Sequence, residues 1–377
     1  MGAVSVTIEI AGLAPERIVF DISPLAELGV ALHALTEPGH HPGLHGWATA
    51  TSAGLKPDLA DRLCEADFLW RTIFSDVFMP FAGLTAAEGG GRPGTTLAED
   101  LDLLDRLDDE RFVAAALEFT CASHYSAGGY SALSDERRRK QALDLAATRG
   151  PRQLDFTRRL LADPAAVRSW VRRLFEDCDE AFFADTWSRT AGRLAADARR
   201  KTDLLRRKGL AETLHAASPA LAVDEDRGRI TADKLAQGRT TAVDPAVGAG
   251  LTLVPTSFGW PHLLVLHAPG WRPVIHYPVS APELTGPGTV QLLERRMEAL
   301  AHPLRMRLCR HLARAAHTTG ELAETCGITA PEVSRHLAVL KKAQLVTTRR
   351  RGRYVLHQLD VAAVARIGSD FLETVLR

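Results

Sequence analysis

A predicted helix near the carboxyl-terminal end of the chain has the residue types and spacing of a DNA-reading surface. One side of it is apolar, because three residues recur at i, i+4 and i+7: Val333, Leu337 and Leu340. The other side is polar and mostly basic: Ser334, Arg335, His336 and Lys341. A helix with these two sides fits the major groove, where arginine can hydrogen-bond the edge of guanine. We therefore predict that these four polar side chains contact bases or adjacent phosphates of double-stranded DNA.

A run of arginines follows this helix. Residues 346–358 predict two strands with Gly352 in the turn between them. The tip carries Arg349, Arg350, Arg351 and Arg353. Alone, such a run indicates a basic hairpin exposed to solvent. Directly after a groove-binding helix, it indicates a wing whose arginines contact phosphates or the minor groove.

Two short helices in tandem would position these side chains. Thr318 stands three residues before Glu321, and Thr329 stands three before Glu332, so each pair predicts a capping box. Gly327 lies between the helices, where a tight turn is needed. The pattern is that of a helix-turn-helix, with Thr329 at the start of the helix that enters the groove and therefore a further candidate DNA contact.

Residues 298–360 resemble the DNA-binding domain of ArsR-type bacterial repressors. The matching segments are His302-Pro303-x-Arg305-x-x-Leu308, Glu321-Leu322-Ala323, Val333-Ser334-Arg335-His336-Leu337-x-x-Leu340 and Leu345-Val346. The resemblance implies that the Ser-Arg-His segment lies on the recognition helix. It also implies that flanking helices, here 290–301 and 361–376, form a symmetric dimer that binds an inverted-repeat operator.

The chain departs from this family at two places. Gln344 stands where the family usually has glycine, which predicts a slightly longer recognition helix. Thr318 and Gly320 stand where the family has metal-binding cysteines, so we expect no metal control of DNA binding. Cys326 is alone in this region, and we expect it to face the local core.

Charge is unevenly distributed along the chain. Residues 291–377 contain 15 Lys+Arg and 8 Asp+Glu, a net of +7. The rest of the chain carries 46 − 15 = 31 against 46 − 8 = 38, a net of −7. A basic end on an acidic body localises the nucleic-acid contact. The 5 cysteines have no close pairing, and the sequence shows no apolar membrane-spanning window and no signal peptide; together these predict a cytoplasmic protein.

Residues 1–280 predict a larger mixed α/β body. Residues 4–10 and 16–22 suggest a strand hairpin, a helix starts at Ser23-Pro24, and the pattern stays mainly helical to about residue 217 before a strand-rich end. Residues 281–288 predict a linker and 289–377 the winged domain. The expected fold class is α+β, mainly helical. Segments such as FDISPLAELGVALHAL and LVPTSFGWPHLLVL resemble actinobacterial ArsR-type regulators whose N-terminal domain has no assigned function.

The body offers few candidate sites. His40, His41 and His45 could bind zinc if they converged, but the intervening Pro-Gly-Leu gives no reason why they should, so we predict no metal. The strand-rich end offers a candidate ligand pocket, although histidines with satisfied hydrogen bonds at a sheet edge are the more common explanation: Trp260, His262, Trp271, His276 and Tyr277.

No catalytic constellation and no cofactor motif is visible in the sequence. We therefore predict a dimeric DNA-binding repressor without enzymatic activity, controlled by a small organic ligand or a partner that the N-terminal body senses. The alternative is an enzyme or protein-interaction module with a regulatory DNA-binding tail.

Overall fold

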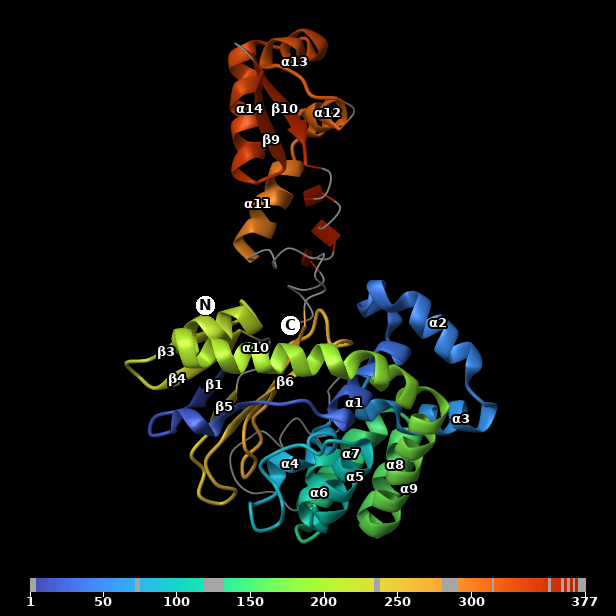
Figure 1. Cartoon of the computed structure of the whole chain (residues 1–377). Helices are drawn as coiled ribbons and strands as arrows, with labels where there is room; N and C mark the ends of the chain where they lie inside the picture. Colours follow the sequence, from blue (N-terminus) through green and yellow to red (C-terminus); the bar gives the residue numbers. More distant parts are fainter. Residues whose placement is uncertain are drawn as a thin grey trace. The chain divides into compact units, whose positions relative to one another are not determined.

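The computed structural model describes residues 5–71, 75–117, 132–233, 238–279, 290–313, 315–351, 354–360, 363–364, 367–368 and 370–371. The chain forms two compact units, Met1–Ala281 and Pro282–Leu376 (Figure 1). Their architecture is α+β and mainly helical, which confirms the predicted fold class. Among the described residues, no helix is long and apolar enough to cross a membrane.

The N-terminal unit is built mainly from helices that follow one another along the chain. They are α1 (Pro24–Thr36), α2 (His45–Gly54), α3 (Pro57–Ala66), α4 (Pro80–Gly83), α5 (Leu97–Arg106), α6 (Asp109–Leu117), α7 (Glu136–Arg149), α8 (Pro151–Ala162), α9 (Pro164–Cys178) and α10 (Ala184–Ala217). One short 3-10 turn precedes α1 and others lie between the helices: η1 (Pro15–Arg17), η2 (Pro38–His40), η3 (Pro42–Leu44), η4 (Asp67–Leu69) and η5 (Asp76–Phe78). Helix α1 begins where the sequence predicts, because the hydroxyl of Ser23 accepts a hydrogen bond from the amide of Ala26.

Two four-stranded sheets complete this unit. The first has the order β3-β4-β1-β5, formed by Leu221–Asp224, Arg229–Asp233, Ser5–Glu9 and Gly238–Thr241. The second has the order β2-β6-β8-β7, formed by Ile18–Phe20, Leu251–Thr256, Val274–Pro278 and Leu264–Leu266.

The predicted hairpin of residues 4–10 and 16–22 is therefore wrong. β1 pairs with β4 and β5, whereas β2 pairs in parallel with β6, so the two strands belong to different sheets. The second strand is also shorter than predicted, because η1 occupies Pro15–Arg17.

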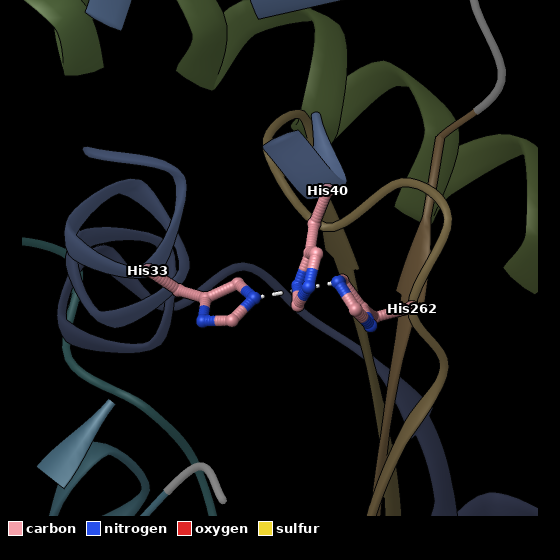
Figure 2. A group of neighbouring side chains, drawn as sticks. All are labelled: His33, His40 and His262. Carbon is pink, nitrogen blue, oxygen red and sulfur yellow. Dashed lines mark hydrogen bonds between the residues drawn. The ribbon is translucent and has the colours of Figure 1, made fainter. Parts of the chain in front are cut away.

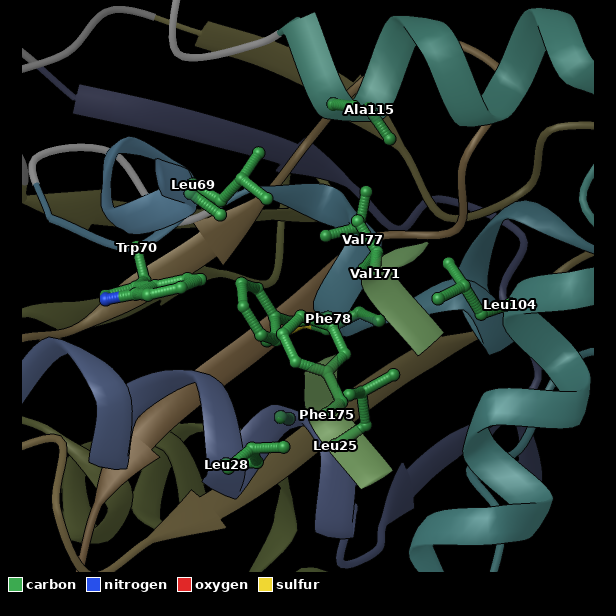
Figure 3. Close-up of a cluster of buried hydrophobic side chains, with 14 of the residues drawn as sticks. Leu25, Leu28, Leu69, Trp70, Val77, Phe78, Leu104, Ala115, Val171 and Phe175 are labelled. Carbon is green, nitrogen blue, oxygen red and sulfur yellow. The ribbon is translucent and has the colours of Figure 1, made fainter. Parts of the chain in front are cut away.

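The main core of the N-terminal unit surrounds α1. Apolar residues occupy every side of this helix, so it is buried on all sides rather than along one stripe. Leu25 and Leu28 are fully buried and belong to the same cluster as Trp70, Phe78 and Phe175 (Figure 3). This packing holds fixed the last turn of α1, which carries His33.

The last part of the region predicted to be mainly helical is a nearly continuous helical segment. α9 runs through the π-helical turn η7 (Asp179–Phe183) into α10. α10 kinks at Gly209, whose φ of 82° and ψ of −179° lie outside the helical region. Glycine has no Cβ and adopts this conformation at little steric cost.

The C-terminal unit consists of α11 (Val290–Leu300), α12 (Pro303–Leu312), α13 (Thr319–Cys326), α14 (Ala330–Lys342), β9 (Val346–Arg351) and β10 (Tyr354–Leu359). Its own core includes Leu308, Leu322, Leu337 and Leu345. Beyond β10, Arg296 of α11 forms a buried ion pair with Asp370, with 2.6 Å between Nη1 and Oδ2. The end of the described chain is thus anchored to α11.

Candidate functional site

The turn between α13 and α14 has the geometry of a helix-turn-helix. The amide of Glu321 donates to the Thr318 hydroxyl at 3.2 Å, and the amide of Thr318 donates to the Glu321 carboxylate at 2.6 Å. This reciprocal pair confirms the predicted capping box at α13. Gly327 ends α13 in the left-handed conformation, with φ 68° and ψ 35°, as the tight turn requires.

The second predicted capping box is absent. Thr329 does stand at the N-cap of α14, in an extended conformation, but its side chain makes no capping hydrogen bond. The amide of Glu332 donates instead to the backbone carbonyl of Thr329 at 3.0 Å. The Thr329 side chain is exposed at the beginning of the helix.

Helix α14 presents the two predicted faces. The apolar stripe of Val333, Leu337 and Leu340 is at most 2% exposed and packs into the core of the unit. Ser334, Arg335 and Lys341 are exposed on the opposite side. Arg335 and Lys341 form no ion pair with any residue that the structure describes, so their charges face outward. We call Ser334, Arg335, His336 and Lys341 the polar face of α14.

His336 differs from its neighbours on this face. Its ring lies 4.9 Å from the ring of His302, measured between centroids, and is partly buried. Partial burial, and then the nearby His302, lower the pKa of His336 below its ordinary value of 6.5. The ring is therefore neutral near pH 7. The positive charge of the polar face rests on Arg335 and Lys341, and His336 offers hydrogen bonds rather than charge.

The predicted wing is a two-stranded antiparallel hairpin. β9 and β10 pair in register from Val346 opposite Leu359 to Arg351 opposite Tyr354. Arg349 and Arg350 are exposed on β9. Arg351 lies at the last described position of that strand, and Arg353 lies outside the described residues. The backbone thus carries the arginine run at the free end of the hairpin.

The bridge between His317 and His357 fixes the base of the wing. Each residue donates its amide to the carbonyl of the other, at 2.9 and 2.8 Å. His317 directly precedes the capping box of α13, so this bridge fixes the wing relative to the helix-turn-helix.

The recognition helix is not lengthened at Gln344. α14 ends at Lys342, and Gln344 adopts a positive φ of 55°. Its amide donates to the carbonyl of Lys341 at 2.9 Å, and that of Leu345 to the carbonyl of Leu340. The chain therefore makes the turn that a glycine would make, with a residue that is strained in this conformation.

The positions where ArsR-type repressors have metal-binding cysteines serve another purpose here. Thr318 caps α13, and Gly320 lies in its first turn. Cys309 and Cys326 are each 7% exposed and belong to the core of the unit, as predicted for Cys326.

The structure separates the three histidines of the predicted HHxxxH motif. His40 and His41 lie near His33 and His262, whereas the Nε2 atom of His45 contacts the backbone carbonyl of Pro38 at 2.7 Å on the exposed side. His33 and His262 are the residues that the motif missed. They come from α1 and from the segment before β7, so their sequence positions carry no local signal.

The five residues suggested as a ligand pocket do not come together. His262 joins the histidines, next to Trp260. Trp271 packs over Gly83 in the core around α1, whereas Tyr277 lies in the second apolar cluster. His276 is fully buried beside Tyr277 on β8.

A cavity of about 810 Å³ lies elsewhere in the N-terminal unit. Its walls come from the chain around η1 and β2 and from the second half of α10, and they include Leu13, Ile18, Arg92, Leu205, Arg206 and Gly209. None of the five pocket residues predicted from the sequence lines this cavity.

Comparison with known proteins assigns both parts of the chain. Residues 4–283 match the model of a family of unknown function, DUF5937, and residues 300–349 match a helix-turn-helix domain. An HTH-type transcriptional regulator of Mycobacterium tuberculosis is 38% identical over 77 residues, which are 20% of this chain and 72% of that protein. The HTH-type transcriptional regulator KmtR of the same organism is 35% identical over 94 residues, 25% of this chain and 72% of that protein.

The biofilm growth-associated repressor of Agrobacterium fabrum is 35% identical over 71 residues, 19% of this chain and 61% of that protein. These similarities confirm the resemblance of the C-terminal unit to ArsR-type regulators, whereas the match to residues 4–283 names no activity. The chain belongs to the DUF5937 family, and its C-terminal unit is the ArsR-type winged helix-turn-helix of a DNA-binding transcriptional regulator.

Proposed function

We propose that this regulator is a homodimeric repressor that binds an inverted-repeat operator and is released by a small organic ligand sensed in its N-terminal unit. The observation that carries the DNA-binding part is the polar face of α14. Arg335 and Lys341 point outward from a helix whose opposite face is locked in the core, and the wing follows directly.

The residues of the recognition helix and the arginines of the wing have different roles in this proposal. Ser334 and Arg335, with Thr329, His336 and Lys341, contact base edges and adjacent phosphates in the major groove. Arg349, Arg350, Arg351 and Arg353 contact the DNA backbone, which adds affinity without sequence information.

Exposed apolar side chains support the dimer. Among the described residues, the large apolar side chains exposed by 41–50% all lie in the C-terminal unit: Met297, Met306, Val339, Val355 and Phe371. Met297 and Phe371 are direct sequence neighbours of Arg296 and Asp370, which pair at 2.6 Å. We therefore expect α11 and the segment around residue 370 to contribute to one apolar surface that a second copy covers.

The 810 Å³ cavity is our candidate for the ligand site. Its volume lies within the range of about 300–1,000 Å³ typical of small-molecule pockets. Leu13, Ile18 and Leu205 provide apolar walls, and Arg92 and Arg206 provide polar groups that can orient a ligand. The kink at Gly209 lies in this wall, so a ligand can bias the arrangement of α10 by binding one arrangement more tightly.

The proposal is tested by selecting operators from random duplexes with the full-length protein. We expect an imperfect inverted repeat whose half-sites are about one helical turn apart, bound by two chains in sedimentation experiments. Met297→Glu should weaken dimerisation and operator binding together, whereas Met306→Glu on α12 is the matched control. A strict monomer on the selected operator contradicts the dimer.

The sensing part is tested separately. Native mass spectrometry of the protein purified from its own cells should show a co-purifying organic molecule. A fragment of residues 281–377 should bind the operator but ignore that molecule, because the C-terminal unit has its own core. If Leu205→Trp in the full chain leaves the response to the molecule unchanged, the cavity is not the ligand site.

A further inference from the structure

Histidines from three distant segments converge in the N-terminal unit. His33 lies in the last turn of α1, His40 ends η2, and His262 precedes β7. Each offers a ring nitrogen, and these nitrogens all lie within 4.8 Å of one another. Figure 2 shows the ring of His40 between those of His33 and His262, whose Nε2 atoms lie 3.3 Å apart.

We propose that His33, His40 and His262 bind one divalent transition-metal ion of the zinc class, with a fourth position left for water or for His41. Zinc binds imidazole nitrogen at about 2.0–2.1 Å, and two such ligands on a tetrahedral ion lie about 3.3–3.4 Å apart. The separation between His33 and His262 already matches this value. The ligand nitrogen of His40 lies within 4.8 Å of those of His33 and His262.

Backbone carbonyls orient the rings as metal ligands. Nδ1 of His33 lies 2.7 Å from the carbonyl oxygen of Trp70. A carbonyl can only accept, so Nδ1 carries the proton and, in the neutral ring, Nε2 presents a lone pair toward His262. Histidines that bind metal usually donate their other ring N–H in this way, which fixes both tautomer and orientation.

His41 repeats this arrangement beside the three ligands. Its Nδ1 lies 2.7 Å from the carbonyl oxygen of Trp260, so its Nε2 also presents a lone pair. The ring is 1% exposed and lies 5.1 Å from that of His33 and 5.2 Å from that of His262, between centroids.

Two ring nitrogens here are buried without a hydrogen-bond partner among the described residues. They are Nδ1 of His40 and Nε2 of His41. Burying a polar atom without a partner costs free energy, because water no longer satisfies it. An ion bound between these rings would satisfy lone pairs that the protein leaves open, which is the second and independent sign of a ligand.

The chemistry of the donors selects the class of ion. Imidazole suits zinc, nickel, copper and cobalt, whereas calcium and magnesium require mainly oxygen ligands. Metal ligation needs unprotonated rings. The carbonyls of Trp70 and Trp260 accept the Nδ1 protons of His33 and His41, so in each neutral ring Nε2 is unprotonated.

Such an ion would join α1, η2 and the loop before β7, which are all parts of the N-terminal unit. We assign it a stabilising role there, separate from the cavity and from the DNA-binding surface. The inference departs from the sequence-based expectation that the chain holds no metal, because His33 and His262 are distant from the motif that contains His40.

The test uses full-length protein stripped with a chelator and titrated with Zn²⁺ against a competing chromophoric chelator. We expect one tight ion per chain and a rise in the midpoint of thermal unfolding with Zn²⁺. Co²⁺ should give the intense visible absorption of a tetrahedral site. His40→Ala should weaken Zn²⁺ binding at least tenfold, and this variant should still fold, because the His40 ring makes no hydrogen bond with the described residues.

His45→Ala is the matched control, since His45 belongs to the same motif but faces away from the three ligands. It should bind Zn²⁺ as the wild type does. His302→Ala controls for the histidine pair of the C-terminal unit. Failure of the stripped wild-type protein to bind one equivalent, or loss of binding in His45→Ala or His302→Ala but not in His40→Ala, overturns the proposal. Neither result bears on DNA binding, which is measured separately.

Discussion

The two units of this chain differ in where their candidate functional side chains lie. The N-terminal unit encloses charged groups: Glu27, Asp100 and Asp197 are at most 3% exposed, and Tyr277 donates a hydrogen bond to Asp197 at 2.8 Å. The C-terminal unit exposes Arg335 on one helix and Met297 on another. The sites that we propose for a ligand and an ion lie inside the first unit, whereas the surfaces that we propose for DNA and a second copy lie on the outside of the second unit.

Substitutions of buried charged residues are expected to change the stability of each unit most. In the C-terminal unit, Asp370→Asn leaves Arg296 buried without its carboxylate partner, and such a loss costs about 3–5 kcal/mol. We expect calorimetry to show a lower midpoint for the C-terminal unit and an unchanged transition for the N-terminal unit.

A double variant separates this effect from simple loss of packing. Arg296→Met with Asp370→Leu removes both charges, and replacing a buried pair by apolar residues is often neutral or stabilising. The double variant should therefore be more stable than Asp370→Asn. If the two are equally unstable, the ion pair is not the cause.

Glu27 provides the corresponding test in the N-terminal unit. Burial raises the pKa of Glu27 from 4.5 to about 7, against hydrogen bonds that include the amide of Ser257 at 2.8 Å. Because the folded state holds the proton more tightly than the unfolded state, stability is fully present below about pH 4.5. It falls as pH rises toward 7, by roughly 3 kcal/mol in total.

Glu27→Gln removes this titration while keeping the shape of the side chain. Near pH 5 the variant should be about as stable as the wild type, and at pH 8 it should be more stable, in denaturant unfolding monitored at each pH. Glu110→Gln, at an exposed position of the same unit, should show no such difference. Equal effects of Glu27→Gln at both pH values contradict the assignment.

Arg335→Ala tests the proposed DNA contact of α14, and its expected effect on binding free energy is smaller. If Arg335 makes a bidentate contact with guanine, its loss should cost about 1–3 kcal/mol on the selected operator and relax sequence preference at one position. Arg349→Ala should weaken binding to all duplexes alike and reduce the salt slope by about one. Arg310→Ala, an exposed arginine on α12, is the matched control.

Fluorescence anisotropy on operator and random duplexes at several salt concentrations distinguishes these cases. Equal losses of Arg335→Ala on operator and on random DNA would show that this side chain contacts phosphate only.

The contrast between the units also explains what the sequence could predict. In the C-terminal unit the signals are local: the Thr318–Glu321 box, the turn at Gly327 and the stripe from Val333 to Leu340 lie within 23 consecutive positions (318–340). The position of each helix can therefore be predicted from the sequence close to it. The N-terminal sites depend on contacts such as that between His33 and His262, which are 229 residues apart. No periodicity or spacing rule connects such positions.

Predictions from local sequence patterns were also wrong in places, because backbone groups made the hydrogen bonds in another way. Thr329 has the spacing of a capping box, but its backbone carbonyl accepts the amide that its hydroxyl was expected to bind. β1 and β2 have the pattern of a hairpin, but their pairing partners lie more than 200 residues later in the chain. Pairing choice is a property of the whole sheet, and the strands alone do not determine it.

The smallest effect is expected at Gln344, where sequence and backbone disagree. The residue adopts φ 55° directly after α14, and a side chain with a Cβ is strained in this left-handed conformation by about 1 kcal/mol or more. Gln344→Gly removes that strain but gives the unfolded chain more freedom, so the net gain should be about 0.5–1 kcal/mol. Since the α14 backbone bonds to Lys341 and Leu340 persist, operator affinity should not change. Thermal unfolding of the full chain measures the gain, and Gln344→Ala, which keeps the Cβ, should show none. A Gly variant that loses stability would mean that the Gln344 side chain contributes more than its strained backbone costs.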